Sequence, residues 1–482
     1  MPTGLCLSSS SSPYVPDSAS PWDLSRARHL YRRIGFGASR DVLTTALNLP
    51  PSVLVDQLID EAIAMPLSPE PSWGNWTIFD YDGPNGRDFN LIYQHYFEWA
   101  YERLIEMGSG GLREKLVLFW SNHFVTEFEL YQTAPGLLQY HKMLQTHAIG
   151  NFKDFVHAVG ITPAMLIYLN GEYSTVQSPN ENYARELYEL FSLGQDNGYS
   201  QQDIVETSRA LTGWYNDDTI TGKFDSIRHD AGEKTIFGQT GNWGYDDVIN
   251  ILFAQKPSQI ARYICEKLYR FFVYEEVSDA FVDDLAQVFI QSNWELAPVL
   301  RMLFKSEHFH DADAIGLQIK SPIQMIFQQV NEMGLPYQLY GSEYFWGATN
   351  LGQQLFSPID VAGWRGHHKW ISTSRLSDRW NQMVYVHYLA AENHASYLRQ
   401  FAKSVSPSET DPEIITQSII EALFPNGLQD ITAYERAAIE FRGDIPSNYF
   451  DDGSWNLDWP QAVWQLFNLL NHLARLPEFQ LT

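Results

Sequence analysis

Hydrophobic positions along this chain recur mostly at helical spacing. Leu112, Leu116, Phe119 and His123 fall at i, i+4, i+7 and i+11, so they form one stripe on a helix, with His123 on the apolar face. Runs that alternate between apolar and polar residues are few. The pattern predicts a mainly α fold, a large multi-helix domain, with further helices over 23–31, 87–107, 246–333 (several), 373–391 and 459–473.

Polar residues predict where two of these helices begin. Ser178 can cap a helix, Pro179 suits its first position, and Glu181 completes a capping box. Ser200 and Asp203 open the next helix in the same way.

Two stretches lack helical periodicity and predict long irregular loops. Residues 215–245 are rich in Gly, Asp, Asn and Thr, with a possible short β-hairpin around 234–237. Residues 336–370 form the second irregular region. Loops of this length inside a compact protein are usually functional, so both are candidate locations for a site.

The chain is long enough for more than one structural unit. Residues 1–20, rich in Ser and Pro, predict a flexible leader, and 21–395 a large helical domain. We expect 396–482 to be a C-terminal helical extension packed on that domain, after a linker-like stretch over 403–412.

Charge narrows the possible partners. The net charge is −26, from 32 basic and 58 acidic side chains, and this repels phosphate backbones and anionic membrane surfaces. We therefore expect no nucleic-acid partner. No stretch approaches the roughly 18 apolar residues of a transmembrane helix, so no membrane span is expected.

The two cysteines lead to separate expectations, and only Cys6 concerns the location of the protein. Cys265 is expected to be a buried free thiol. Cys6, before a serine tract, is similar to the start of a mature lipoprotein, although no secretory signal precedes it. A plain disordered tail is the alternative.

Several motifs in a fixed order resemble the bacterial domain-of-unknown-function-1800 family. They are Arg33–Gly37, Arg113–Lys115, Phe119–Phe124, Asn180–Leu187, Phe191–Gly194, Ala210–Trp214, His229–Lys234 and Pro358–Trp364. The resemblance covers roughly residues 21–395. It implies a mostly helical protein, commonly exported, whose gene often lies beside that of a sulfatase- or phosphatase-like protein. No reaction comes with it. Ser121 stands where the family often has a first histidine.

His123 and Glu186 are the candidate residues on helices. A histidine on a dry helix face is either a metal ligand or base or a hydrogen-bonded core residue. Glu186 and Glu189 share a helix face and can bind an ion or act as an acid–base pair, whereas Arg185 offers them plain salt bridges.

The long loops carry the other candidates. His229 and Asp230 are candidate catalytic residues, with His229 also a possible metal ligand, and Lys234 could hold an anion. Trp364, His367 and His368 could line a cleft for a sugar or another flat ligand, or they could simply anchor a packed loop.

Two functions remain open. In the first, the protein is a metal-dependent enzyme in which His123, Glu186, His229 and Asp230 meet around a divalent metal ion, acting on an extracellular polymer or its fragments. In the second, it is a non-catalytic binding or assembly protein of the cell envelope, partnering the sulfatase-like protein or holding a polysaccharide. Both place the protein outside the cytoplasm, although a cytoplasmic location is not excluded.

Overall fold

The protein is a helical body, as predicted. The structure is a computed structural model that describes residues 10–428 and 430–482, without the side chain of Tyr337. Helices, short 3-10 helices included, hold 61% of the described residues. In order they are α1 (Leu24–Ile34), α2 (Arg40–Ala46), α3 (Pro51–Ala64), α4 (Phe89–Ser109), α5 (Gly111–His123), α6 (Phe128–Tyr131), α7 (Ala134–His147), α8 (Phe152–Gly160), α9 (Pro163–Tyr168), α10 (Glu181–Glu189), α11 (Gln201–Ala210), α12 (Tyr245–Gln255), α13 (Pro257–Phe272), α14 (Asp279–Gln291), α15 (Leu296–Lys305), α16 (Glu307–His310), α17 (Pro322–Glu332), α18 (Gly341–Asn350), α19 (Thr373–Asn393), α20 (Ala395–Val405), α21 (Pro412–Leu423), α22 (Ile431–Arg442), α23 (Ser447–Asp451) and α24 (Ala462–Ala474).

Strands occur as three small antiparallel pairs within the described residues. These are β1 (Asp82–Gly83) with β2 (Gly86–Arg87), β3 (Trp214–Asn216) with β4 (Gly222–Phe224), and β5 (Lys234–Ile236) with β6 (Gln239–Gly241). The last pair is the predicted hairpin, with Lys234 opposite Gly241 and Ile236 opposite Gln239.

One predicted helix start is confirmed and the other is wrong. Ser200 and Asp203 form a reciprocal capping box at the start of α11. At α10 the cap is Asn180 rather than Ser178: its side chain accepts a hydrogen bond from the backbone N–H of Asn182, 2.9 Å away. Asparagine and serine cap about equally well, so the pattern alone could not choose between them.

The predicted irregular region over 336–370 contains the helix α18. The helix was not predicted because glycine is unfavourable in the interior of a helix. A Cβ added to Gly347 would lie 2.4 Å from the side-chain Nε2 of Gln382 on α19, so the glycine allows close packing with that helix. Only 351–366 is an irregular loop before the short 3-10 helix His367–Trp370.

Helix α5 runs through the core. Every residue from Leu112 to Ser121 is buried, and so is His123, although the segment includes Arg113, Glu114 and Lys115. An amphipathic surface helix buries one stripe, whereas this one is covered on all sides. Its charged side chains must therefore find partners inside the protein.

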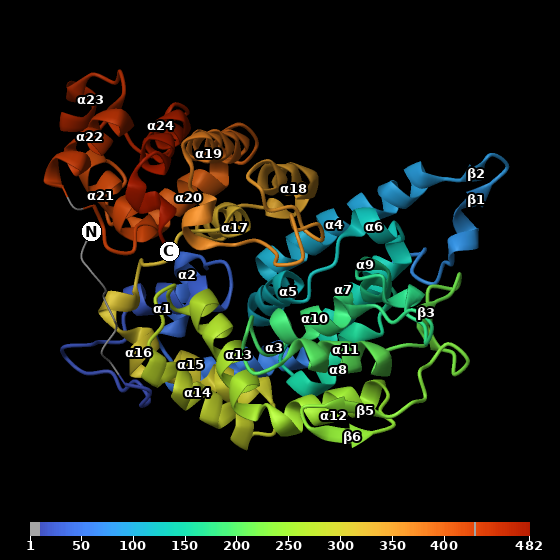
Figure 1. Ribbon diagram of the computed structural model, residues 1–482. Coiled ribbons are helices and arrows are strands. Elements are labelled where there is room, and N and C mark those ends of the chain that lie inside the picture. Colours follow the sequence, from blue (N-terminus) through green and yellow to red (C-terminus); the bar gives the residue numbers. More distant parts are fainter. Residues whose placement is uncertain (1–9, 429) are drawn as a thin grey trace.

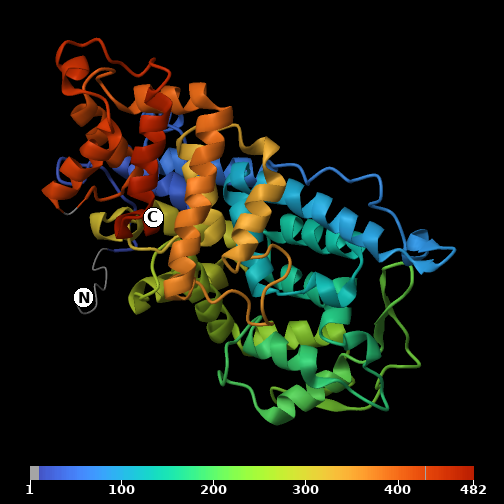
Figure 2. The same ribbon diagram turned by 90° about the horizontal axis from the view of Figure 1, so that it is seen from above.

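The two ends of the described chain meet beside this core. Figures 1 and 2 show α21–α24 at one end of the molecule and the β1–β2 hairpin at the other. Helix α24 packs on α19 and α22. The buried Arg32 of α1 donates to the backbone oxygen of Leu423 at the end of α21, 2.9 Å away. The segment after residue 395 is thus joined directly to the first helix.

The N-terminal predictions are only partly covered. Cys6 lies outside the described residues. Of the predicted leader, Pro13 bridges to Ser306 and Tyr14 stacks on His310, with ring centroids 4.6 Å apart. The described residues contain no single helix with the length and apolar composition of a membrane span. Helices α2 and α3, bent by 118°, have that length and composition only when taken together. Cys265 is buried, as expected.

Candidate functional site

His123 is held by protein groups at both ring nitrogens. Its Nε2 lies 3.1 Å from the carbonyl oxygen of Phe191, and its Nδ1 lies 2.9 Å from Nζ of Lys267 on α13. A carbonyl only accepts, so Nε2 carries the proton and Nδ1 accepts from the lysine. Burial and the charge of Lys267 hold the pKa of His123 well below its usual range. The residue is a neutral imidazole that positions a lysine.

The predicted catalytic loop residues form a compact cluster with α11. Asp230 accepts from Nε of Arg209 at 2.7 Å and from the backbone N–H of Gly232 at 2.8 Å. Lys234 is buried and donates to the backbone oxygens of Asp230 and Gly232. His229 lies with Nδ1 2.9 Å from the Thr212 carbonyl oxygen. We call Arg209, Asp230 and Lys234 the loop cluster. Glu206 lies 2.8 Å from Arg209 and adds a second carboxylate, so two acidic side chains balance the two basic ones.

The predicted metal ligands do not converge. Glu186 is half-buried on α10, and burial, followed by the charge of Glu189, raises the pKa of its carboxyl group. In the part of the chain that the structure describes, no group of three or more His, Cys, Asp or Glu side chains could hold a metal ion. His123, Glu186 and His229 therefore do not form one centre.

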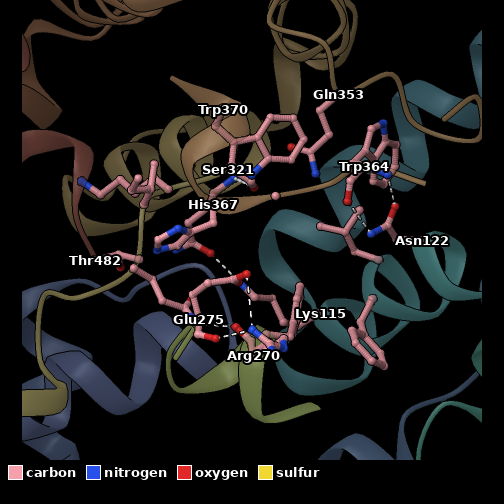
Figure 3. Close-up of a pocket in the computed structure, with 18 of the residues that line it drawn as sticks. Lys115, Asn122, Arg270, Glu275, Ser321, Gln353, Trp364, His367, Trp370 and Thr482 are labelled. Carbon is pink, nitrogen blue, oxygen red and sulfur yellow. Dashed lines mark hydrogen bonds and ion pairs between the residues drawn. The ribbon is translucent and has the colours of Figure 1, made fainter. Parts of the chain in front are cut away.

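The second predicted loop borders a real cavity. Trp364 and His367 line a pocket of about 290 Å³, while His368 is exposed and is not among its lining residues. Figure 3 shows Trp364, His367 and Trp370 on one side of the pocket and Lys115 and Arg270 on the other. Three predicted ligand-binding residues of one loop thus divide into two that face the pocket and one that does not.

The pocket is strongly cationic in a protein that is otherwise acidic. We call it the cationic pocket. One acidic side chain, Glu275, lines it, against seven basic ones: Arg32, Arg33, Lys115, Lys267, Arg270, Lys320 and Arg365. Like charges repel when water is excluded, so such a grouping costs stability unless something else compensates for it.

Three of these cations have carboxylate partners. Arg32 makes a two-point pair with Glu332 of α17, with atoms 2.5 and 2.9 Å apart. Arg270 pairs with Glu266 at 2.9 Å and with Glu275 at 3.4 Å. The exposed Arg365 lies 3.6 Å from Asp360. Their charge is largely compensated, so they shape the wall of the pocket rather than provide its excess charge.

Within the described residues, Lys115 and Lys320 have neutral hydrogen-bond partners only. Nζ of Lys115 donates to the amide oxygen of Gln324 and lies 4.0 Å from the ring centre of Phe36. Nζ of Lys320 donates to the backbone oxygen of Phe479 at 2.7 Å. Both lysines are buried, and burial lowers the pKa of each well below its usual value. An anion bound nearby would favour their charged forms.

Arg33, from the first family-like motif, also lines the pocket. It donates to the side-chain oxygen of Gln318 and, at 2.8 Å, to the backbone oxygen of Thr482. Its Nε is buried and has no hydrogen-bond partner among the described residues. Burial, with a contribution from Arg32, lowers the pKa of Arg33 to about 9.

Lys267 is the third cation that has no carboxylate partner among the described residues, and it is half-buried at the pocket wall. Besides His123, its Nζ lies 3.4 Å from the hydroxyl oxygen of Tyr263 and 5.1 Å from the centre of that ring. Burial lowers the pKa of Lys267 to about 8. This lysine changes its charge close to neutral pH, as reactive lysines do.

Asn122 anchors the loop that carries Trp364 to α5. Its side-chain oxygen accepts from the backbone N–H of Trp364 at 2.5 Å, and its amide donates to the carbonyl oxygen of Trp364 at 3.1 Å. Gly363 lies so close that a Cβ there would be 2.2 Å from the Asn122 side-chain oxygen. The glycine and the asparagine together place Trp364 over the pocket.

The three cations without carboxylate partners among the described residues, Lys115, Lys267 and Lys320, were not predicted from the sequence. Lys115 carried a signal, since it lies three residues after Leu112 and four before Phe119, within the apolar stripe. A charge in that position is either buried or marks the edge of the stripe. Lys267 and Lys320 carried no comparable signal.

The fold and the pocket define a mainly helical protein with a cationic pocket where α1, α5 and α13 meet. The chain belongs to the family described as a protein of unknown function (DUF1800), whose model matches residues 29–481. This is the family that the motifs resembled, and the match continues through 396–481, beyond the expected family-like domain. Comparisons with curated proteins and with solved structures found no match.

Proposed function

We propose that the protein binds an anionic ligand in the cationic pocket, through a carboxylate, phosphate or sulfate group. The observation that carries the proposal is a set of three cations around one cavity of about 290 Å³, Lys115, Lys267 and Lys320, for which the described residues provide no carboxylate partner. Unpaired buried cations destabilise a protein, and an anionic ligand is the compensation that a pocket provides.

The aromatic residues beside these cations favour an acidic sugar as the ligand. Trp364 and Trp370 line the same pocket, and the indole N–H of Trp364 is buried with no hydrogen-bond partner among the described residues. A flat apolar surface next to a cation suits a sugar ring that carries an anionic group. This fits the binding-protein hypothesis, in which the protein is exported, holds a polysaccharide and partners a sulfatase-like protein.

Calorimetric titration with sodium sulfate and sodium phosphate tests the binding. We expect saturable binding to the wild type, and a loss of roughly 10- to 100-fold in affinity in the double variant Lys115→Met/Lys320→Met. The matched control is Lys142→Met/Lys153→Met, which removes two lysines that do not line the pocket. No binding to the wild type, or equal binding to both double variants, would refute the proposal.

A matched pair of sugars tests the acidic-sugar part. Glucuronate and glucose differ in one carboxylate, so tighter binding of glucuronate that Lys115→Met/Lys320→Met abolishes would support an acidic sugar. Equal and weak binding of both sugars, alongside clear sulfate binding, would support the anion site and refute an acidic sugar as its ligand.

A further inference from the structure

Lys267 differs from the other pocket cations in the atom that its amine contacts. Its partner is the Nδ1 lone pair of His123, 2.9 Å away, and the Nε2–H of that ring is already used on the Phe191 carbonyl oxygen. The ring therefore has one tautomer and holds the amine in one place. Within the described part of the chain, Lys267 forms no ion pair with a carboxylate.

We propose that Lys267 is a nucleophilic amine that condenses with the carbonyl group of a small anionic aldehyde or ketone bound in the cationic pocket. This inference rests on the proposed anion binding and adds a covalent step to it. The neighbouring cations supply the recognition, because Arg33, Lys115 and Lys320 line the same cavity. The volume of about 290 Å³ limits the ligand to a small molecule or to the end of a larger one.

The chemistry is an imine formation without any redox step. The lone pair of the uncharged Nζ attacks the carbonyl carbon, a C–N bond forms, and the carbonyl oxygen becomes a hydroxyl group. That hydroxyl leaves as water, whose two protons come from the nitrogen, and a C=N bond remains. The reaction needs an uncharged amine, and the pKa of about 8 for Lys267 provides a useful fraction of it near neutral pH.

Reductive trapping with a matched pair of aldehydes tests this step. The full-length protein is incubated at pH 8 with glyoxylate and cyanoborohydride, which reduces an imine to a stable secondary amine, and modified lysines are located by peptide mass spectrometry. We expect Lys267 to be modified at least about 10-fold faster than Lys142 or Lys153, because far less of an ordinary lysine is uncharged at this pH. Glycolaldehyde, which has no charge, should show much weaker preference for Lys267, and sulfate should protect it from glyoxylate.

The variant Lys267→Arg separates this inference from the proposed function. It keeps a positive charge and cannot form an imine, so it should bind sulfate and lose the preferred adduct. If the wild type binds sulfate but Lys267 is modified no faster than Lys142, the imine is refuted and anion binding stands. If the wild type binds no anion, the proposed function fails. The measurement on the wild type decides the matter even if Lys267→Arg does not fold.

Discussion

The loop cluster and the cationic pocket both gather charged side chains, yet they treat charge in opposite ways. In the loop cluster, Arg209 and Lys234 are matched by the carboxylate of Asp230 and by backbone oxygens within four residues of it. In the cationic pocket, Lys115 and Lys320 are matched only by an amide oxygen and a backbone oxygen. The charges of the loop cluster are balanced locally, whereas the pocket has excess positive charge beside a cavity.

The difference teaches how to separate a structural charge cluster from a functional one. A buried pair whose members satisfy each other stabilises local geometry, and removing one member leaves the other unpaired. A buried cation with no counter-ion lowers stability and persists where a ligand uses it. Substitution should therefore affect stability in the loop cluster and affinity in the pocket.

The largest effect is expected for Asp230→Asn. The amide keeps the shape of the side chain but removes one of the two carboxylates that contact Arg209, Glu206 being the other, so the free energy of unfolding should fall by about 2 kcal/mol. Urea unfolding followed by circular dichroism measures it. Sulfate affinity should not change, since none of the three residues lines the pocket.

The control for this substitution is Asp458→Asn, which removes one carboxylate of an exposed ion pair with Lys403. It should change the free energy of unfolding by less than about 0.5 kcal/mol. Equal destabilisation by the two substitutions would show that the loop cluster is not a special buried pair.

The opposite behaviour is expected for Lys115→Met. Methionine fills similar space without a charge, so the free energy of unfolding should change by less than about 1 kcal/mol, while sulfate affinity falls about 10-fold. Urea unfolding and calorimetric titration measure the two quantities. A loss of stability as large as that of Asp230→Asn would make Lys115 a structural residue and erase the contrast between the regions.

A pH series should give a smaller change. The pKa of Lys267 is about 8, below the value of 10.5 for an ordinary lysine, so the folded protein loses this proton at a lower pH than the unfolded chain does. Sulfate affinity should therefore fall about 3- to 10-fold as pH rises from 7 to 9, because sulfate keeps its charge and Lys267 does not. Calorimetric titration measures it, and Lys267→Arg should flatten the profile.

The same pKa shift predicts the sign of a stability change. Between pH 8 and 10.5 the unfolded chain still holds the Lys267 proton and the folded protein does not, so this residue makes the protein more stable as pH rises through that range. The free energy of unfolding of the wild type should therefore rise relative to that of Lys267→Met over the same range. A constant difference would mean that the lysine has an ordinary pKa.

Much of the fold could be predicted because its information is local. The capping box of Ser200 and Asp203 and the stripe through Leu116 and Phe119 each act within a few turns of helix. Helix α18 was not predicted from the sequence. Its Gly347 allows close contact with Gln382, which lies 35 positions later, and nothing near the glycine in the chain indicates that contact.

The pocket could be predicted only in part, for the same reason. Trp364 and His367 stood out as a polar and aromatic loop, and both line the pocket. The excess charge comes from α1, α5, α13 and the segment before α17, which are far apart in sequence. Apart from Lys115, which lies within an apolar stripe, each basic residue taken alone is typical of a solvent-exposed surface, so the excess charge becomes visible only when the elements are assembled.

The smallest predicted effect separates two adjacent histidines. His367 lines the pocket and His368 is exposed, so only His367 can offer a ring N–H to a bound anion. His367→Asn should weaken sulfate binding about 3-fold and His368→Asn should leave it unchanged. Asparagine suits this position because His367 has a φ of +46°, a conformation that asparagine adopts more readily than most residues. Calorimetric titration of both variants measures the difference. Equal losses of sulfate affinity would mean that the loop responds as a unit. Local neutralisation of charge alone would then not distinguish the cationic pocket from the loop cluster.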